Sequence, residues 1–408
     1  MKKSLLTIFS FSCFFMLHNI CSANNTSNKI DQSQNSAGNV SAVDTKKINT
    51  NEQFKARVHY ALPDGSVSDR IMIKPFAKKI EEATNGKIKF EFYPSMQLGG
   101  KPSDIVAQVE NGQVEMVFTV AEYHPGRFPS LEALDQMGAI TLDHVRNNNV
   151  ARQFFNIVKD QPEFKNIKII AIASQPKVMM HFKENIKLQN IKDLKGLNMR
   201  ASNKPVGAAW TELGINPIYC TAKELFELLL AGNLQGAGAP FELLKSTKIY
   251  QQLNQTLVAP MFTNVFLLIM NKDFFNSLPK DLQEKIDQYS MNEEFIKEVG
   301  ANWMAEEKKA IGDMLLTGKH KFYDLDDKTG DFIEIKVDTV KDLEKNPKLL
   351  EANIEKIWEI QNNNVKKMHN NTSYFSQLKD KLVLNWKNTA KGKDFYDPLM
   401  LIINENTK

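Results

Sequence analysis

Between residues 57 and 120, stretches with the two-residue period of a strand alternate with stretches that have the 3.6-residue period of a helix. A strand at Val58–Leu62 leads through the turn Pro63-Asp64-Gly65 into a helix with apolar residues at helical spacing from Ile73 to Ile80. The same succession continues as a strand at 88–92, a helix at 102–110 and a strand at 114–120. Because strands separated by single helices usually pair in parallel, the pattern predicts an α/β lobe.

This succession of strands and helices restarts near residue 168. Strands are expected at 168–173, 198–201 and 263–270, and helices at 205–213 and 221–231. Thr221 and Glu224 have the spacing of a capping box, which fixes the start of the latter helix. A helical pattern then runs from Pro279 to about Leu316 and is long enough to brace both lobes.

The patterns together predict an α/β protein with two lobes, because chains of this size usually divide their core. We assign residues 53–174 and 265–295 to the first lobe, and residues 175–264 and 296–345 to the second. Residues 346–408 are expected to form a C-terminal helical extension.

The first 52 residues have no pattern of a folded lobe. Lys2 and Lys3 precede an apolar stretch from Leu5 to Leu17, and small residues follow as far as Ala23. This order is typical of a secretory signal, so we expect cleavage after Ala23 and export to the periplasm. The apolar stretch is too short to span about 30 Å of hydrocarbon. Residues 24–52 are rich in Asn, Ser, Lys and Gln, which predicts a disordered spacer.

Charge and cysteine content argue against several classes of protein. The formal charge of +4 falls to +2 once the two lysines of the signal are removed, and such a small charge is not typical of a nucleic-acid-binding protein. Cys220 is the only cysteine after residue 23, so no intramolecular disulfide is expected. No two histidines are three or four residues apart, and the sequence has no nucleophile elbow, P-loop or dinucleotide-binding motif. We therefore expect no metal, no cofactor and no enzymatic activity.

Six stretches carry a pattern beyond their secondary structure: Tyr93–Gly100, Glu110–Met116, Tyr123–Pro129, Leu194–Arg200, Leu228–Pro240 and Met270–Pro279. Together and in this order they resemble the solute receptors of tripartite ATP-independent periplasmic (TRAP) transporters. The resemblance covers about residues 55 to 320. It implies a two-lobe periplasmic binding protein of the Venus-flytrap type, which binds a small organic carboxylate and delivers it to the membrane subunits of a TRAP permease.

The chain also departs from the family pattern at several positions. Gln235 stands where the family usually has Asp, and Ser202 stands where it usually has Pro. A second arginine, which is often found near Gln175 or Lys177, is missing. These departures affect the identity of the ligand more than the fold.

Arg200 ends the fourth of the six stretches, at the position of the family's ligand-binding arginine. A guanidinium group can meet both oxygens of a carboxylate and so replace the water that the anion loses. A helix is predicted to begin near Ser202 and Asn203, and its free backbone N–H groups would point toward the same anion. On spacing alone, the alternative for an arginine at a strand end is a surface ion pair.

Three further candidates come from the ends of strands in the first lobe. His59 and Tyr60 end the first strand, and Tyr123 lies just after the third. Open α/β sheets present their ligand-binding loops at these ends. Core packing or a surface position is the alternative for each of them.

Four candidates belong to the second lobe or to its borders. Phe241 and Glu242 follow a strand of small residues, and Glu242 can either accept a ligand hydroxyl or ammonium group or cap its own helix. Lys177 can replace the missing second arginine as a point charge, or be solvated. Asn264 can donate to a carboxylate from the returning strand.

Two other classes of function stay open from the sequence. An exported α/β hydrolytic enzyme could use His59 or His124 together with Glu242, and would show turnover. A receptor could hand its ligand to a sensor protein or to an ATP-driven permease. For any receptor of this kind, the expected mechanism is closure of the two lobes around the ligand.

Overall fold

The computed structural model describes residues 53–137, 143–370 and 373–407. The expected signal peptide (1–23) and spacer (24–52) lie outside these ranges. Within them, no helix is both long and apolar enough to cross a membrane.

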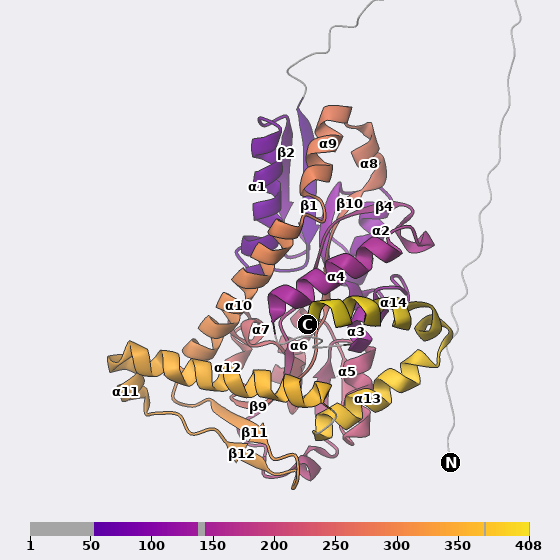
Figure 1. The fold of residues 1–408 in the computed structure, drawn as a ribbon. Helices are drawn as coiled ribbons and strands as arrows, with labels where there is room; N and C mark the ends of the chain where they lie inside the picture. Colours follow the sequence, from indigo (N-terminus) through magenta and orange to yellow (C-terminus); the bar gives the residue numbers. More distant parts are fainter. Residues whose placement is uncertain (1–52, 138–142, 371–372, 408) are drawn as a thin grey trace, which may run out of the picture. The chain divides into compact units, whose positions relative to one another are not determined.

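The first sheet has five strands in the order β2-β1-β3-β10-β4 (Figure 1). They are β1 (Phe54–Tyr60), β2 (Ile88–Tyr93), β3 (Met116–Val120), β4 (Ile167–Ser174) and β10 (Val265–Asn271). β1 pairs in parallel with β2 and β3, as the sequence predicts. The prediction of parallel pairing is wrong for β10, which runs antiparallel to β3 and β4. The reason is that the chain enters β10 from β9 of the second sheet at the edge where β3 and β4 end, so β10 runs back against both of them.

The second sheet has seven strands in the order β12-β11-β9-β5-β8-β6-β7. They are β5 (Val178–Phe182), β6 (Asn198–Ala201), β7 (Asn216–Tyr219), β8 (Gly236–Ala239), β9 (Gln255–Phe262), β11 (Lys321–Leu325) and β12 (Phe332–Glu334). β6 pairs in parallel with both β7 and β8, whereas β5 runs antiparallel to β8 and β9. Every residue of β9 is buried, so its sequence has no polar alternation that would mark it as a strand.

Helices bury the apolar faces of both sheets. The first sheet packs against α1 (Lys74–Ala83), α2 (Ile105–Glu110), α4 (His144–Val158) and α8 (Lys272–Ser277), with α9 (Lys280–Tyr289) beside α1. The second sheet shares its core with α5 (Lys204–Glu212), α6 (Ala222–Leu230) and α7 (Phe241–Ser246). Two further short helices are α3 (Glu132–Met137) and α11 (Val340–Lys345).

The single long helix predicted from Pro279 to Leu316 is two helices, α9 and α10 (Glu293–Leu316). The backbone of Met291 adopts a left-handed conformation with φ of 52°, which ends the helical path. Asn292 then caps α10 by accepting a 3.0 Å hydrogen bond from the backbone N–H of Phe295.

α10 is nevertheless the brace that the sequence predicts. It packs on α4 beside the first sheet and on α7 beside the second (Figure 1). Its Trp303 is fully buried and lies 4.8 Å from the ring centroid of Phe266 in β10. The architecture is thus the expected α/β fold with two lobes and a helix that contacts both.

The C-terminal helices also contact elements of both sheets. α12 (Pro347–His369) packs on β9, α13 (Tyr374–Lys387) on α5, and α14 (Ala390–Thr407) on α4 and α3. Leu399, Ile402 and Ile403 of α14 enter the hydrophobic core on one face of the first sheet. The residues after 346 are therefore an integral part of the packing.

Leu399 and Leu401 offer a matched test of this packing. Leu399 is fully buried in the core of the first sheet, whereas Leu401, on the same helix, is 61% exposed. We expect Leu399→Ala to lower the free energy of unfolding by about 2–5 kcal/mol, because it leaves a cavity in the core. Leu401→Ala should change it by less than about 0.5 kcal/mol. Urea denaturation measures both, and equal effects would show that α14 is not packed as described.

Candidate functional site

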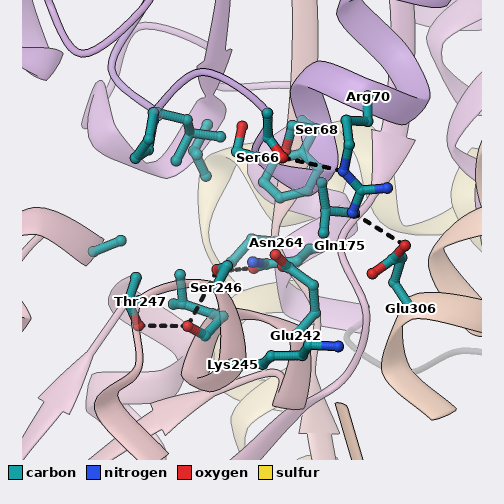
Figure 2. Close-up of a pocket in the computed structure, with 18 of the residues that line it drawn as sticks. Ser66, Ser68, Arg70, Gln175, Glu242, Lys245, Ser246, Thr247, Asn264 and Glu306 are labelled. Atoms are coloured by element: carbon teal, nitrogen blue, oxygen red, sulfur yellow. Dashed lines mark hydrogen bonds and ion pairs between the residues drawn. The ribbon is translucent and has the colours of Figure 1, made fainter. Parts of the chain in front are cut away.

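A cavity of about 270 Å³ lies where elements of both sheets meet (Figure 2). The loop after β1, the ends of β3 and β10, and the 3₁₀ turn that follows β3 line it from the first sheet. β6, the start of α6 and four residues of α7 line it from the second. Its wall combines apolar side chains such as Phe266 and Leu243 with hydroxyl, amide and charged groups. This combination is typical of sites for small molecules.

Arg200, at the wall of this cavity, is held by the backbone. Its side chain is only 1% exposed, and its Nε and Nη1 atoms donate to the carbonyl oxygens of Cys220 and Gly238 at 3.1 and 2.8 Å. Trp210 fixes the backbone of Arg200 in turn, because its Nε1 donates to the Arg200 carbonyl at 3.0 Å. A Cβ atom at Gly238 would lie 2.9 Å from the Trp210 ring, so a glycine allows this close packing.

No described residue accepts a hydrogen bond from Nη2 of Arg200, and none of the described carboxylates forms an ion pair with this guanidinium. Burying a charge without an ionic partner is costly. The structure thus places a buried cation beside a cavity, and the Nη2 group of this cation is available to donate hydrogen bonds. An anion in that cavity would complete its interactions.

Asn264 and Gln175 form a buried amide pair at the same wall. Asn264 Oδ1 accepts from Ser202 Oγ and from Asn203 Nδ2, both at 3.0 Å. The Nδ2 of Asn264 donates to the side-chain oxygen of Gln175, and the Gln175 N–H donates to the Asn264 carbonyl at 2.7 Å. Asn264 therefore orients Gln175, which also lines the cavity.

Tyr123 and Glu242 lie on the cavity from opposite sheets. The Tyr123 hydroxyl accepts from the backbone N–H of Ala222 at 3.1 Å, which leaves its own hydrogen for another partner. Burial raises the pKa of Tyr123, so this hydroxyl stays protonated. Burial also raises the pKa of Glu242 to about 7, although the Ser246 hydroxyl acts in the opposite direction.

The loop after β1 contributes Arg70, which the sequence does not single out. Its guanidinium pairs with Glu306 of α10 at 3.1 Å, and its Nε donates to the Gly65 carbonyl at 3.1 Å. The buried Asp69 anchors the loop by accepting from the Tyr60 hydroxyl at 2.8 Å and from the Gly65 N–H at 2.7 Å. The turn Pro63-Asp64-Gly65 was the available sequence signal, because it marks a loop at the carboxyl end of a strand.

Four of the eight predicted ligand-binding residues do not line the cavity. In β1, His59 is buried and 2.9 Å from Gln108 Oε1, and the buried Tyr60 donates to Asp69. The ring of Phe241 packs in the core between His181 and Phe322. All three side chains point into packed surroundings, and the loop beyond β1 reaches the cavity in their place.

Lys177, the fourth, is buried in a separate small hollow beside His144, Glu307 and Trp358. Its Nζ lies 5.9 Å from the centroid of the Trp358 ring. Burial lowers the pKa of Lys177 to about 8. It therefore does not replace a second arginine at the cavity.

Glu306 and Glu307, adjacent in α10, hold opposite walls of the cavity. Glu306 pairs with Arg70, from the loop after β1. The buried carboxylate of Glu307 accepts from the backbone N–H groups of Phe241 and Glu242, at 3.2 and 2.7 Å, and so fixes the first turn of α7. Burial raises the pKa of Glu307 to about 8, against the effect of these two donors.

The described residues contain no group of three or more His, Cys, Asp or Glu side chains arranged to hold a metal ion. The cavity itself offers one buried cation, two further cations that are paired, and a set of hydroxyl and amide groups. This arrangement can bind a small polar anion by charge-assisted and neutral hydrogen bonds.

Comparison with known proteins supports the fold. Residues 58–329 match the family described as bacterial extracellular solute-binding protein, family 7 (DctP). A solute-binding protein of Verminephrobacter eiseniae is 28% identical over 229 residues, which are 53% of this chain and 65% of that protein. The C4-dicarboxylate-binding periplasmic protein DctP of Rhodobacter capsulatus is 26% identical over 255 residues, 61% of this chain and 74% of that protein. The matches span only 56 to 65% of the first three curated relatives.

Solved structures share the two-lobe architecture. A TRAP solute-binding protein from a marine metagenome, crystallised with 3-hydroxybenzoate, has a TM-score of 0.64 and 25% identity. The match covers 88% of this chain and all of that one. The chain therefore has the fold of a TRAP solute-binding protein.

The adjacent glutamates of α10 give a matched pair of substitutions. We expect Glu307→Ala to lower the free energy of unfolding by about 2–4 kcal/mol, because two buried N–H groups of α7 lose their acceptor. Glu306→Ala breaks an ion pair that solvent partly reaches, and should cost less than about 1 kcal/mol. Urea denaturation of the two variants checks the order, and a larger effect at Glu306 would contradict it.

Proposed function

Because the chain belongs to family 7 of the bacterial extracellular solute-binding proteins, we propose that it is the periplasmic solute receptor of a TRAP transporter. Its ligand would be a small organic carboxylate held in the cavity at Arg200. The observation that carries this proposal is the buried guanidinium of Arg200, which has no carboxylate partner among the described residues and faces the cavity. A ligand carboxylate would supply the missing charge.

The surrounding groups fit a carboxylate. Two backbone carbonyls hold the Nε and Nη1 edges of Arg200, so the guanidinium is already oriented before a ligand enters. Tyr123 and Gln175 also line the cavity, and the Tyr123 hydroxyl and the Gln175 amide nitrogen each carry a hydrogen that can be donated. The volume of about 270 Å³ is slightly below the usual range of about 300–1,000 Å³ for ligand sites, which favours a small acid.

Two of the known proteins support an acid ligand. The Rhodobacter capsulatus relative is named for binding C4-dicarboxylates, and the marine metagenome protein holds 3-hydroxybenzoate. These two ligands differ in size and shape but share a carboxylate. The feature shared by the ligands would therefore be the carboxylate. The shape of the rest of the cavity would determine which size and shape of ligand fits.

The proposed mechanism is closure of the two lobes on the ligand. Both sheets contribute to the cavity, so an anion bound to Arg200 of β6 would also touch groups from the first sheet. Such a ligand stabilises the closed arrangement by its extra contacts there. TRAP membrane subunits would then recognise the closed form and take up the ligand.

The geometry gives less support to an exported hydrolytic enzyme. His124 is buried, with Nε2 2.7 Å from Thr119 Oγ1 and Nδ1 3.2 Å from the Ser103 carbonyl. Neither His124 nor His59 lines the cavity that contains Glu242. The acid–base pair that this alternative needs is thus not assembled at the cavity.

The first test is ligand binding by wild type and Arg200→Ala. Thermal shift followed by calorimetry, with a panel of small mono- and dicarboxylates, should identify at least one ligand. Arg200→Ala should weaken its binding by about 30-fold to several thousand-fold, because a buried charged partner is worth roughly 2–5 kcal/mol.

Arg146→Ala is the matched control for this test. Arg146 is exposed and does not line the cavity, so its removal should leave affinity unchanged. Retention of tight binding by a folded Arg200→Ala protein would overturn the assignment of the site.

A further inference from the structure

We propose that the ligand carries a hydroxyl group besides its carboxylate, and that Glu242 and the hydroxyl side chains of α7 recognise this group. The inference rests on the proposed function, because it assumes that Arg200 holds the carboxylate. It concerns the wall that α7 forms in the same cavity, where Glu242, Ser246 and Thr247 project (Figure 2).

The α7 wall presents hydrogen-bond acceptors to the cavity. Ser246 Oγ and Thr247 Oγ1 both donate to the carbonyl of Leu243, at 3.3 and 2.5 Å. A hydroxyl has one hydrogen, so Thr247 Oγ1 is left with lone pairs only, and Ser246 Oγ shares its hydrogen between the Leu243 carbonyl and the carboxyl group of Glu242. A ligand group that binds here must therefore supply the hydrogen.

Glu242 adds a buried carboxyl group to this wall. It is 8% exposed and forms no ion pair with the described lysines and arginines. The other two carboxylates of the cavity are paired, Asp64 with Lys74 at 2.6 Å and Glu306 with Arg70 at 3.1 Å. Glu242 is thus the carboxyl group of this cavity that is left to accept from a ligand.

A hydroxyl group suits this wall better than an ammonium group. Arg70 and Lys245 line the same cavity, and Lys245 lies on α7 itself. Both cations are already paired, Arg70 with Glu306 and Lys245 with Asp313, but burial of a ligand ammonium group would still cost the hydration of a charge, whereas a neutral hydroxyl donates its hydrogen without that cost.

The facing loop offers a second contact for the same hydroxyl. Ser66, in the loop after β1, has a buried Oγ without a hydrogen-bond partner among the described residues. Figure 2 shows Ser66 and Ser68 across the cavity from Ser246 and Thr247. A ligand hydroxyl between them could donate to α7 and accept from the loop, and so bridge the two walls.

A purely apolar ligand tail would leave these groups unsatisfied. Sites built to bind a hydroxyl discriminate strongly against analogues that lack it, because buried polar groups are then left without partners. The wall therefore predicts specificity as well as affinity.

The test compares matched acids by calorimetry on the purified protein: malate with succinate, 3-hydroxybutyrate with butyrate, and 4-hydroxyphenylacetate with phenylacetate. At least one hydroxylated acid should bind about tenfold or more tightly than its partner. In Glu242→Leu the ratio of the two affinities should fall to within about threefold, because the carboxyl group that accepts from the ligand hydroxyl is gone. Arg200→Ala should lose both members of the pair.

The outcomes separate the two proposals. Equal binding of all pairs by wild type, or a preference that persists in Glu242→Leu, would overturn the hydroxyl inference and leave the carboxylate receptor standing. If folded wild-type protein binds no acid of any kind, the proposed function fails and the inference fails with it. Should Glu242→Leu not fold, Thr247→Val, which removes one acceptor of the same wall, must reduce the preference; an unchanged preference would contradict the inference.

Discussion

A buried arginine without a carboxylate partner is the constraint on which the cavity depends. The guanidinium of Arg200 can be tolerated in this position only because two backbone carbonyls, those of Cys220 and Gly238, accept from it. Those carbonyls in turn need the close approach of β6, β8 and the start of α6, which the small residues of β8 permit. The packing of the second sheet therefore determines how the positive charge of Arg200 is stabilised at the cavity.

α10 links the two walls that surround this charge. One turn of the helix offers carboxylates to both sides, Glu306 to Arg70 and Glu307 to the first turn of α7. The first interaction reaches solvent and can be remade at little cost, whereas the second is buried and fixed. The first turn of α7 is therefore fixed to α10 by buried hydrogen bonds, whereas Glu306 contacts the segment after β1 through a partly exposed ion pair.

The sequence predicted the fold well because its signals there are local. The period of each strand and helix, the capping box at Thr221 and each of the six motifs can be recognised within a short stretch of sequence. The lining of the cavity was predicted only in part, and which of these residues bind a ligand stays a prediction. Arg200, Tyr123, Glu242 and Asn264 line the cavity, but His59 and Tyr60 turn into packed surroundings, and a strand end alone does not tell which side chain faces out. Arg70 was missed because its partner Glu306 is far along the chain, and such a pairing leaves no local pattern.

The packing of α14 has a consequence for how the molecule is made. Ile105 of α2 and Ile403 of α14 belong to one hydrophobic core. Segments that are far apart in the sequence must therefore come into contact before water is excluded from this core. Contacts between such distant segments form late and slow the folding of a chain. A growing polypeptide therefore cannot finish this core until its last helix has been synthesised.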